Sequence, residues 1–410
     1  MPVALITDAE LMSSLAVIRS LGRRGFTIVA ASADSSAVGF RSRYTTVRLH
    51  DPAWRRSPEL IRQALVEAVE RHGVELLVPV TDETLLTVVP YAKDFPSVCT
   101  LATAAVEALY TTMDKAATLK LAADIGIPVP DSVLVTDPWA ADLSIGDLGL
   151  PLVMKPQYSR VLTPEGHFKR FSTSYACDET TARRRMRSGE EASENIGMLL
   201  QRYWPGSGVG VSMLTSNGRP LAAFQHRRLR ELPPSGGVGA LCESVDLDRQ
   251  LYDYASRLLA ALHWTGLAMV EFKVRDGEVV LMEVNGRIWG SLPLAVHSGM
   301  DFPAKLSDLF LQESPASIEV DTSYQRGVRG HHMAHELDWI EAVLRRREQP
   351  PAGPPWPRRA ALGAMADLFR PSYRYDGIAV DDPLPAISDV ASTLRRFSRR
   401  LVNEVERRLA

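Results

Sequence analysis

The chain has 410 residues, of which 45% are hydrophobic and 23% are charged, and its formal net charge is −2. This length exceeds one compact domain, so two or three α/β units are expected. The charge argues against a general nucleic-acid binder, and no apolar run is long enough to cross a bilayer. The first residues lack the basic and apolar regions of a secretory signal.

The three cysteines, Cys99, Cys177 and Cys242, are odd in number and far apart. This spacing suits neither a disulfide framework nor a zinc knuckle. We therefore expect reduced thiols that fill packing positions in a cytoplasmic protein.

Strand and helix patterns alternate between residues 2 and 110. Apolar runs at 3–7, 26–31 and 76–80 predict buried strands, and helical spacing follows the first of them. A second helix begins at Ser57-Pro58 and ends at Gly73. This alternation predicts a mostly parallel sheet, which binds ligands beyond the carboxyl ends of its strands.

The turn after the first strand contains no glycine, which argues against the dinucleotide site of an NAD-dependent oxidoreductase. Three acids follow strands in this region: Asp8, Asp82 and Glu83. Asp82 and Glu83 are candidate contacts to a second substrate. The alternative is that they are ordinary acids at a helix N-terminus, which is the reading we favour for Asp8.

Residues 111–265 contain several weaker signals. A helix begins at Asp114-Lys115 and ends near Gly126, and a strand over 151–156 carries Lys155 at its end. A polar loop follows to about residue 174. The apolar strand 199–204 opens into a segment with three glycines, and two antiparallel strands meet around 217–218.

The stretch from residue 266 to 290 is the most informative one. It reads as two apolar strands joined by a tight turn, and each strand carries an acid at a position that favours an apolar residue. Glu271 lies in the first strand. Glu283, Asn285 and Arg287 alternate in the second, so they share a face. Two carboxylates, an amide and a guanidinium suit Mg2+ and the phosphates of a nucleotide.

The length of the turn decides whether the two acids meet. A two-residue turn would pair Glu271 with Met282 and send the acids to opposite faces. A three-residue turn would pair Glu271 with Glu283. We predict the second register, and the alternative is two exposed acids on unrelated faces.

The end of the chain has a different character. A proline-rich break spans 350–357. Residues 390–410 then form an amphipathic helical pattern with paired arginines and the apolar residues Leu394, Phe397, Leu401, Val405 and Leu409. We expect this apolar stripe to pack on the body of the protein. The alternative is contact with a membrane surface or a partner.

Taken in order, the Asp-Lys helix, the strand-end lysine, the flexible loop, the glycine segment and the Glu…Glu-x-Asn-x-Arg hairpin resemble the ATP-grasp superfamily. This superfamily includes carbamoyl phosphate synthase, biotin carboxylase and D-alanine–D-alanine ligase. The resemblance covers residues 1 to about 310. The runs HRRLRELPPSGG and EVNGRIWGSLPLA are most similar to uncharacterised ATP-grasp carboligases, of the carboxylate–amine ligase or carbamoyl phosphate synthase large-subunit type.

The resemblance implies an α/β fold whose ATP-grasp part is α+β. We expect a Rossmann-like domain over 1–110, a small lobe with the phosphate loop over 111–200, a large lobe with the metal site over 201–335, and a helical extension over 336–410. The loop after Lys155 has only Gly166, together with Arg160, Lys169 and Arg170, where many members are glycine-rich.

The resemblance also assigns roles. Lys115 and Lys155 would contact ATP phosphates, and Glu271, Glu283 and Asn285 would bind Mg2+, with Mn2+ as the alternative. Arg287 would steady the transferred phosphate or the reaction intermediate. The adenine would meet the strand and glycine segment represented by Gln201, Arg202, Tyr203, Trp204 and Gly208.

The segment 226–237 predicts a substrate site. Alternation would bring His226, Arg228 and Arg230 to one face, and Ser235, Gly236 and Gly237 could offer N–H groups to an anion. A carboxylate or acyl phosphate suits this cluster, and the alternative is a basic surface strand with its turn.

Together these features predict an ATP-dependent carboxylate–amine ligase that acts on small molecules through an acyl phosphate. Arg287, Arg228 and Lys155 are its expected catalytic residues. A non-catalytic ATP- or ADP-binding regulatory module on the same fold is the alternative, and a homodimer is left open.

Overall fold

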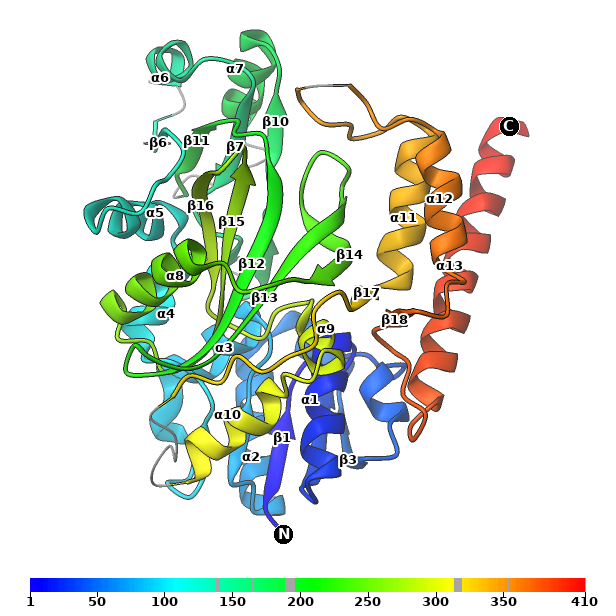
Figure 1. Ribbon diagram of the computed structural model, residues 1–410. Coiled ribbons are helices and arrows are strands. Elements are labelled where there is room, and N and C mark those ends of the chain that lie inside the picture. Colours follow the sequence, from blue (N-terminus) through cyan, green and yellow to red (C-terminus); the bar gives the residue numbers. More distant parts are fainter. Residues whose placement is uncertain (138–140, 164–165, 189–195, 313–318, 353, 410) are drawn as a thin grey trace.

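The computed structural model describes residues 1–137, 141–163, 166–188, 196–312, 319–352 and 354–409. Three sheets lie one above another, and the last helices run along one side (Figure 1). The fold is mixed α/β, with a parallel sheet at the N-terminus and antiparallel strands dominating the rest. No helix among these residues is long and apolar enough to span a membrane.

The N-terminal sheet has five parallel strands in the order β3-β2-β1-β4-β5. The predicted strands and helices of this region are confirmed. For example, the Ser57 side chain accepts the Leu60 N–H where α2 begins, and Gly73 ends α2 with a φ of 61°. The elements are β1 (Val3–Ile6), α1 (Met12–Arg23), β2 (Thr27–Ser32), β3 (Thr45–His50), α2 (Pro58–His72), β4 (Leu76–Val78), α3 (Asp82–Val88) and β5 (Thr100–Leu101).

The second sheet is small and antiparallel, in the order β10-β7-β11-β6. The polar loop predicted after Lys155 contains a short hairpin of its own, β8 paired with β9. The elements are α4 (Val106–Met113), α5 (Lys115–Asp124), β6 (Ser132–Val135), α6 (Ala141–Leu148), β7 (Leu152–Pro156), β8 (Arg160–Leu162), β9 (Phe168–Arg170), β10 (Ser174–Ala176), α7 (Glu179–Ser188) and β11 (Met198–Arg202).

The third sheet has seven strands in the order β16-β15-β12-β13-β14-β17-β18. Its pairs are antiparallel except β17 with β18. The strands are β12 (Ser207–Ser216), β13 (Arg219–Leu232), β14 (Val238–Ser244), β15 (Gly266–Arg275), β16 (Glu278–Asn285), β17 (Arg329–His331) and β18 (Tyr373–Tyr375).

The helices of this part fall into two groups. The first group consists of α8 (Arg249–Ala261), α9 (Leu292–His297) and α10 (Phe302–Leu311). The second belongs to the C-terminal extension: α11 (Met333–Leu344), α12 (Arg359–Asp367) and α13 (Leu384–Leu409). The extension is helical as predicted, but it also supplies β18 to the edge of the large sheet.

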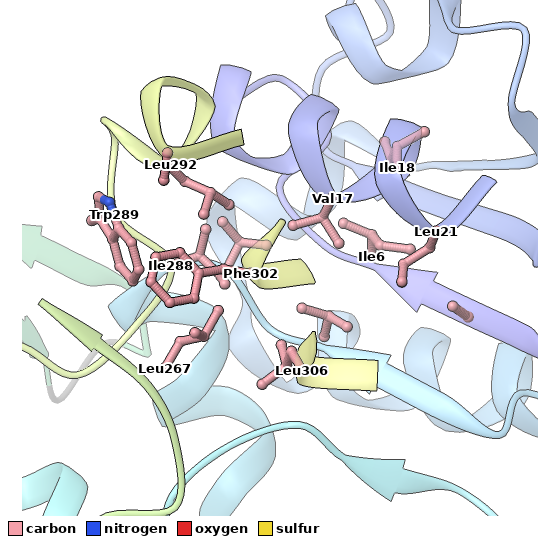
Figure 2. Packing of buried hydrophobic residues seen from close by; sticks show 14 of the residues in the cluster. Ile6, Val17, Ile18, Leu21, Leu267, Ile288, Trp289, Leu292, Phe302 and Leu306 are labelled. Atoms are coloured by element: carbon pink, nitrogen blue, oxygen red, sulfur yellow. The ribbon is translucent and has the colours of Figure 1, made fainter. Parts of the chain in front are cut away.

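A shared hydrophobic core joins the N-terminal sheet to the large sheet (Figure 2). Trp289 is buried and packs edge-on against Phe302, with 5.5 Å between ring centroids. The cluster draws on β1, α1, β15, α9 and α10, and includes Ile6, Val17, Ile18, Leu21, Leu267, Ile288, Leu292 and Leu306. The chain leaving β16 is therefore fixed against α1, which holds the end of that strand beside the N-terminal sheet.

Candidate active site

The turn between β15 and β16 has two residues, one fewer than we predicted from the sequence. Asp276 and Gly277 alone connect the strands, because Arg275 pairs with Glu278. Both turn residues have positive φ values, 51° and 84°, which is typical of a two-residue hairpin turn. The prediction of a three-residue turn is wrong.

A β-bulge nevertheless brings the two acids together. Leu281 keeps the register set by the turn, whereas Glu283 lies opposite Glu271, so Met282 is the extra residue on β16. The Asn285 amide Nδ2 donates a hydrogen bond to Glu271 Oε1 over 2.9 Å. The pairing that we predicted is present, although the bulge rather than the turn produces it.

A third charged side chain, that of Arg228 on β13, contacts this acidic face. Its guanidinium lies 2.5 Å from Glu271 Oε2 and 3.4 Å from Glu231 Oε1. Burial alone would lower the pKa of Arg228, but the two glutamates outweigh burial and raise it. Burial raises the pKa of Glu271, and Arg228 opposes that shift. A Cβ at Gly208 on β12 would lie 2.5 Å from Glu231 Oε1 and 3.0 Å from Arg228 Cδ, so a side chain there would displace these two residues.

Two buried lysines approach the acids from the small sheet and α5. Lys115 Nζ donates to Ser159 Oγ over 2.7 Å and to the Pro156 carbonyl over 3.3 Å. Burial lowers the pKa of Lys155 to about 8, with Glu283 opposing and Lys115 adding to the shift. Burial would raise the pKa of Glu283, but the positive charges of Lys115 and Lys155 lower it. Glu283 is therefore ionised although it is surrounded by protein.

A cavity of about 170 Å³ opens beside these groups. Its charged and amide lining residues come from all three sheets or their helices: Asp82, Lys115, Arg160, Arg170, Glu283, Asn285 and Arg287. Arg287 Nε lies 3.2 Å from Asp82 Oδ2, which ties the end of β16 to α3. The N-terminal sheet thus closes one side of the cavity.

The donor set fits a hard divalent cation. The described residues hold no group of three or more His, Cys, Asp or Glu side chains suited to a metal, so a zinc-type site is not present among them. Glu271 and Glu283 supply two carboxylates on one face. Asn285 uses its amide nitrogen toward Glu271, which leaves its oxygen for a ligand. Oxygen donors of this kind are those that Mg2+ prefers.

Comparisons with known proteins agree with this arrangement. A sequence family described as "ATP-grasp in the biosynthetic pathway with Ter operon" matches residues 194–333. The fold matches biotin carboxylase from Campylobacter jejuni with a TM-score of 0.62 and 15% identity, covering 80% of this chain and 74% of the other. Residues 194–333 thus carry the sequence pattern of an ATP-grasp family, and the chain has a fold similar to that of biotin carboxylase.

Two further solved structures have a similar fold. L-amino acid ligase from Bacillus licheniformis matches with a TM-score of 0.56 and 14% identity, over 78% of this chain and 75% of that one. The biotin carboxylase domain dimer of Hydrogenobacter thermophilus 2-oxoglutarate carboxylase, in complex with MgADP, ADP and bicarbonate, matches with a TM-score of 0.61 and 14% identity, over 80% and 73%. At these identities the likeness concerns the fold.

The two acids of α3 were interpreted either as substrate contacts or as ordinary acids at a helix N-terminus, and the structure has features of both. Thr81 caps α3, and Asp82 and Glu83 lie in its first turn. Each acid also pairs with an arginine, since Glu83 Oε1 lies 2.6 Å from Arg160 Nε. Asp82 lines the cavity, whereas Glu83 does not. Asp8 is not the cap of α1 but accepts hydrogen bonds from the hydroxyls of Thr7, Thr81 and Thr84.

The predicted adenine strand lies outside the lining of the cavity. Gln201 is fully buried and donates to Ser132 Oγ, while its side-chain oxygen has no partner among the described residues. The N–H groups of Arg202 and Tyr203 donate to the carbonyls of Asp131 and Pro151. The side chain of Trp204 lies against Gly206.

The basic segment of β13 does not share one face. Arg228 pairs with Cys242 but Arg230 pairs with Leu241, so Leu229 is an extra residue and the alternation is broken. Arg230 turns to the C-terminal extension, where it binds Glu336 and Asp367 at 2.7 and 2.9 Å. The prediction that Arg230 faces the same way as Arg228 is wrong.

His226 on β13 and Glu271 on β15 lie on either side of Gly210 on β12, because both residues pair with it. Burial, with a smaller effect of Arg228, lowers the pKa of His226 to about 3. Its Nε2 lies 3.3 Å from Ser291 Oγ, and its Nδ1 is buried with no partner among the described residues. His226 is therefore a neutral side chain beneath the site.

The turn over Ser235, Gly236 and Gly237 contacts the site through its carbonyl groups. Arg228 Nη1 donates to the Gly237 carbonyl over 2.9 Å, and the Tyr175 hydroxyl to that of Gly236 over 3.4 Å. The Gly236 N–H already donates to the Pro233 carbonyl within the turn.

Sequence reasoning missed several cavity and network residues. Ser159, which binds Lys115, and Phe171 both line the cavity. Glu231 contacts Arg228 from within the basic segment that the sequence singled out. The position of Ser159 four residues after Lys155 was the available signal, but a lone serine in a polar loop is too common to select.

Proposed function

We propose that this protein is an ADP-forming, ATP-dependent ligase that joins a carboxylate to an amine. The observation that carries the proposal is the pair Glu271 and Glu283 on one face, with Lys115 and Lys155 close enough to lower the pKa of Glu283. Two acids kept beside two buried lysines form a charged site that contributes little to the stability of an empty protein. Such a site suits a nucleotide triphosphate with a divalent cation.

For nucleotide binding, Lys115 and Lys155 supply positive charge to the phosphates. The orphaned side-chain oxygen of buried Gln201 suits the exocyclic amino group of adenine, and the strand Gln201–Trp204 with Gly208 forms the proposed adenine side.

For the metal, Glu271, Glu283 and Asn285 would hold Mg2+, with Mn2+ as the alternative. The bound cation would spread the negative charge of the phosphates and make the γ-phosphorus easier to attack. Each oxygen of Glu271 already has one partner, Asn285 on Oε1 and Arg228 on Oε2, so the cation would share this carboxylate with them.

In the proposed reaction a substrate carboxylate oxygen attacks the γ-phosphorus, giving an acyl phosphate and ADP. The amine then attacks the acyl carbon and phosphate leaves. Arg287 borders the cavity and would stabilise the oxyanion, with Arg228 behind it; one such donor contributes about 3 kcal/mol to lowering the barrier. Asp82 would hold the amine, because it is the acid of α3 that lines the cavity.

The division into parts 1–110, 111–200, 201–335 and 336–410 belongs to the same proposal, as do a cytoplasmic location and small-molecule substrates. A homodimer is left open, since the 2-oxoglutarate carboxylase domain was solved as a dimer.

The deciding experiment is an ADP-release screen of carboxylic acids crossed with amines, followed by mass spectrometry of the products. The expected result is ADP release that needs both substrates and yields an amide. ATP binding without ADP release from any pair would instead favour a non-catalytic nucleotide-binding module.

A further inference from the structure

The helix α13 carries apolar side chains on the face turned away from the protein. Leu384, Ile387 and Leu394 are 60%, 62% and 57% exposed, and Val380 just before the helix is 98% exposed. In Figure 1, α13 runs along one edge of the molecule. The prediction that Leu394 packs on the body is therefore wrong. The side chains of 401–410 lie outside the described residues.

The exposed residues form one stripe. At about 100° per residue, Leu384, Ile387 and Leu394 fall within about 80° of the helix circumference. The buried residues Ala386 and Thr393 lie on the opposite side. The described part of the protein thus covers one face of the helix, and it leaves the apolar stripe on the other face exposed.

Near the stripe, the acidic residues contact the body of the protein, whereas two arginines are exposed. Three acids of residues 376–400 are engaged toward the body, since Asp381 binds Arg23, Asp382 binds Arg19 and Asp389 contacts Tyr375. The fourth, Asp376, is half-buried and precedes the helix. Arg395 and Arg399 are exposed and have no acidic partner among the described residues. They lie on one flank of the stripe, so the charge beside it is positive over residues 384–400.

We propose that this face of α13 docks on a membrane surface that contains anionic lipids. Exposed apolar side chains beside unpaired arginines match the interior and the headgroups of such a surface, in the manner of an interfacial helix. A second copy of the same face would bring arginines against arginines, which disfavours self-association through it. The proposal is independent of the ligase chemistry.

The test uses the full chain and sedimentation with lipid vesicles. Wild type is expected to bind vesicles of phosphatidylcholine mixed with phosphatidylglycerol, and to bind phosphatidylcholine alone at least about tenfold more weakly. Ile387→Gln with Leu394→Gln should reduce binding to the mixed vesicles about tenfold or more. Arg395→Gln with Arg399→Gln should reduce it and remove its dependence on salt.

The matched control is Leu60→Gln with Val98→Gln, which changes two residues that are 42% and 69% exposed outside α13. It should bind as wild type does, and thermal melting checks that every variant is folded. Equal binding by wild type and the Ile387/Leu394 variant, or no binding by wild type, would overturn the proposal. Self-association in solution that only the Ile387/Leu394 variant loses would assign the face to a second copy and likewise overturn it.

Discussion

Arg228 and Arg230 lie two residues apart on β13, yet they belong to two different charge clusters. Arg228 contacts Glu271 and Glu231 near the cavity, where Lys115 and Lys155 add further positive charge. Arg230 contacts Glu336 and Asp367 and stacks on Trp339 at 5.6 Å from the ring centroid.

The two clusters differ in how far their charges are compensated by neighbouring residues. Around Arg230 two acids and an aromatic face surround the guanidinium, and Arg370 also binds Asp367, so the cluster holds the extension to the sheet. Near Arg228 the lysines have lowered pKa values and a cavity lies beside the acids. The first arrangement favours the folded protein, and the second is suited to a charged ligand.

The largest effect is expected from Glu283→Gln in the cavity cluster. Because the amide removes a negative charge from the proposed metal site, ADP release should fall about 1000-fold, which corresponds to about 4 kcal/mol of barrier. The melting temperature should also fall, because buried Lys115 and Lys155 lose the carboxylate that stabilises their charged forms, so ADP release is compared per folded molecule. Steady-state ADP release and thermal melting measure the two quantities.

Glu278→Gln is the control, because Glu278 is exposed at the other end of β16. It should retain the wild-type rate. A Glu283→Gln protein with full activity would remove Glu283 from the metal site and, with it, the main support for the ligase proposal.

The second effect concerns stability rather than turnover. Arg230→Met leaves buried Glu336 without its cation, so the free energy of unfolding should fall by about 3 kcal/mol. ADP release per folded molecule should stay near the wild-type value. Chemical denaturation and activity at matched folded concentration separate these outcomes.

Arg227→Met provides the neighbouring control. Arg227 is half-exposed and pairs with Glu243, so its loss should cost about 0–1 kcal/mol. If Arg230→Met abolished turnover in a protein of normal stability, the division between the two clusters would be wrong. Arg230 would then belong to the substrate site, as predicted from the sequence.

The sequence predicts the site's position better than its geometry. Apolar runs, Ser57 and Gly73 located the N-terminal strands and α2, because caps and hydrophobic spacing are local signals. The Glu and Asn positions of the hairpin identified the acidic face in the same way. These features depend on neighbours a few residues away in the chain.

The bulges at Met282 and Leu229 could not be predicted. Each inserts one residue into a ladder, and the alternation of side chains gives no sign of where that happens. One bulge brought Glu283 opposite Glu271 despite a short turn, and the other sent Arg230 to the extension. Both depend on how the strand twists against its neighbours in the folded sheet.

The smallest effect is a pH dependence that belongs to the cavity cluster alone. Lys155 has a pKa of about 8 without ligand, so it is charged below that pH and neutral above it. Nucleotide phosphates favour the charged form. Affinity should therefore be strongest below pH 8 and should weaken by up to about tenfold for each pH unit above it.

Nucleotide Kd measured from pH 7.5 to 9.5 tests this expectation. Burial lowers the pKa of Lys115 as well. Lys155→Arg should reduce the pH dependence, and Lys155→Arg with Lys115→Arg should abolish it, since guanidinium groups stay protonated throughout. Because Arg230 binds Glu336 and Asp367, and its charge is not among those that shift the pKa of either lysine, Arg230→Met should keep the wild-type profile. A Kd that does not change with pH in the wild type would place both lysines away from the phosphates.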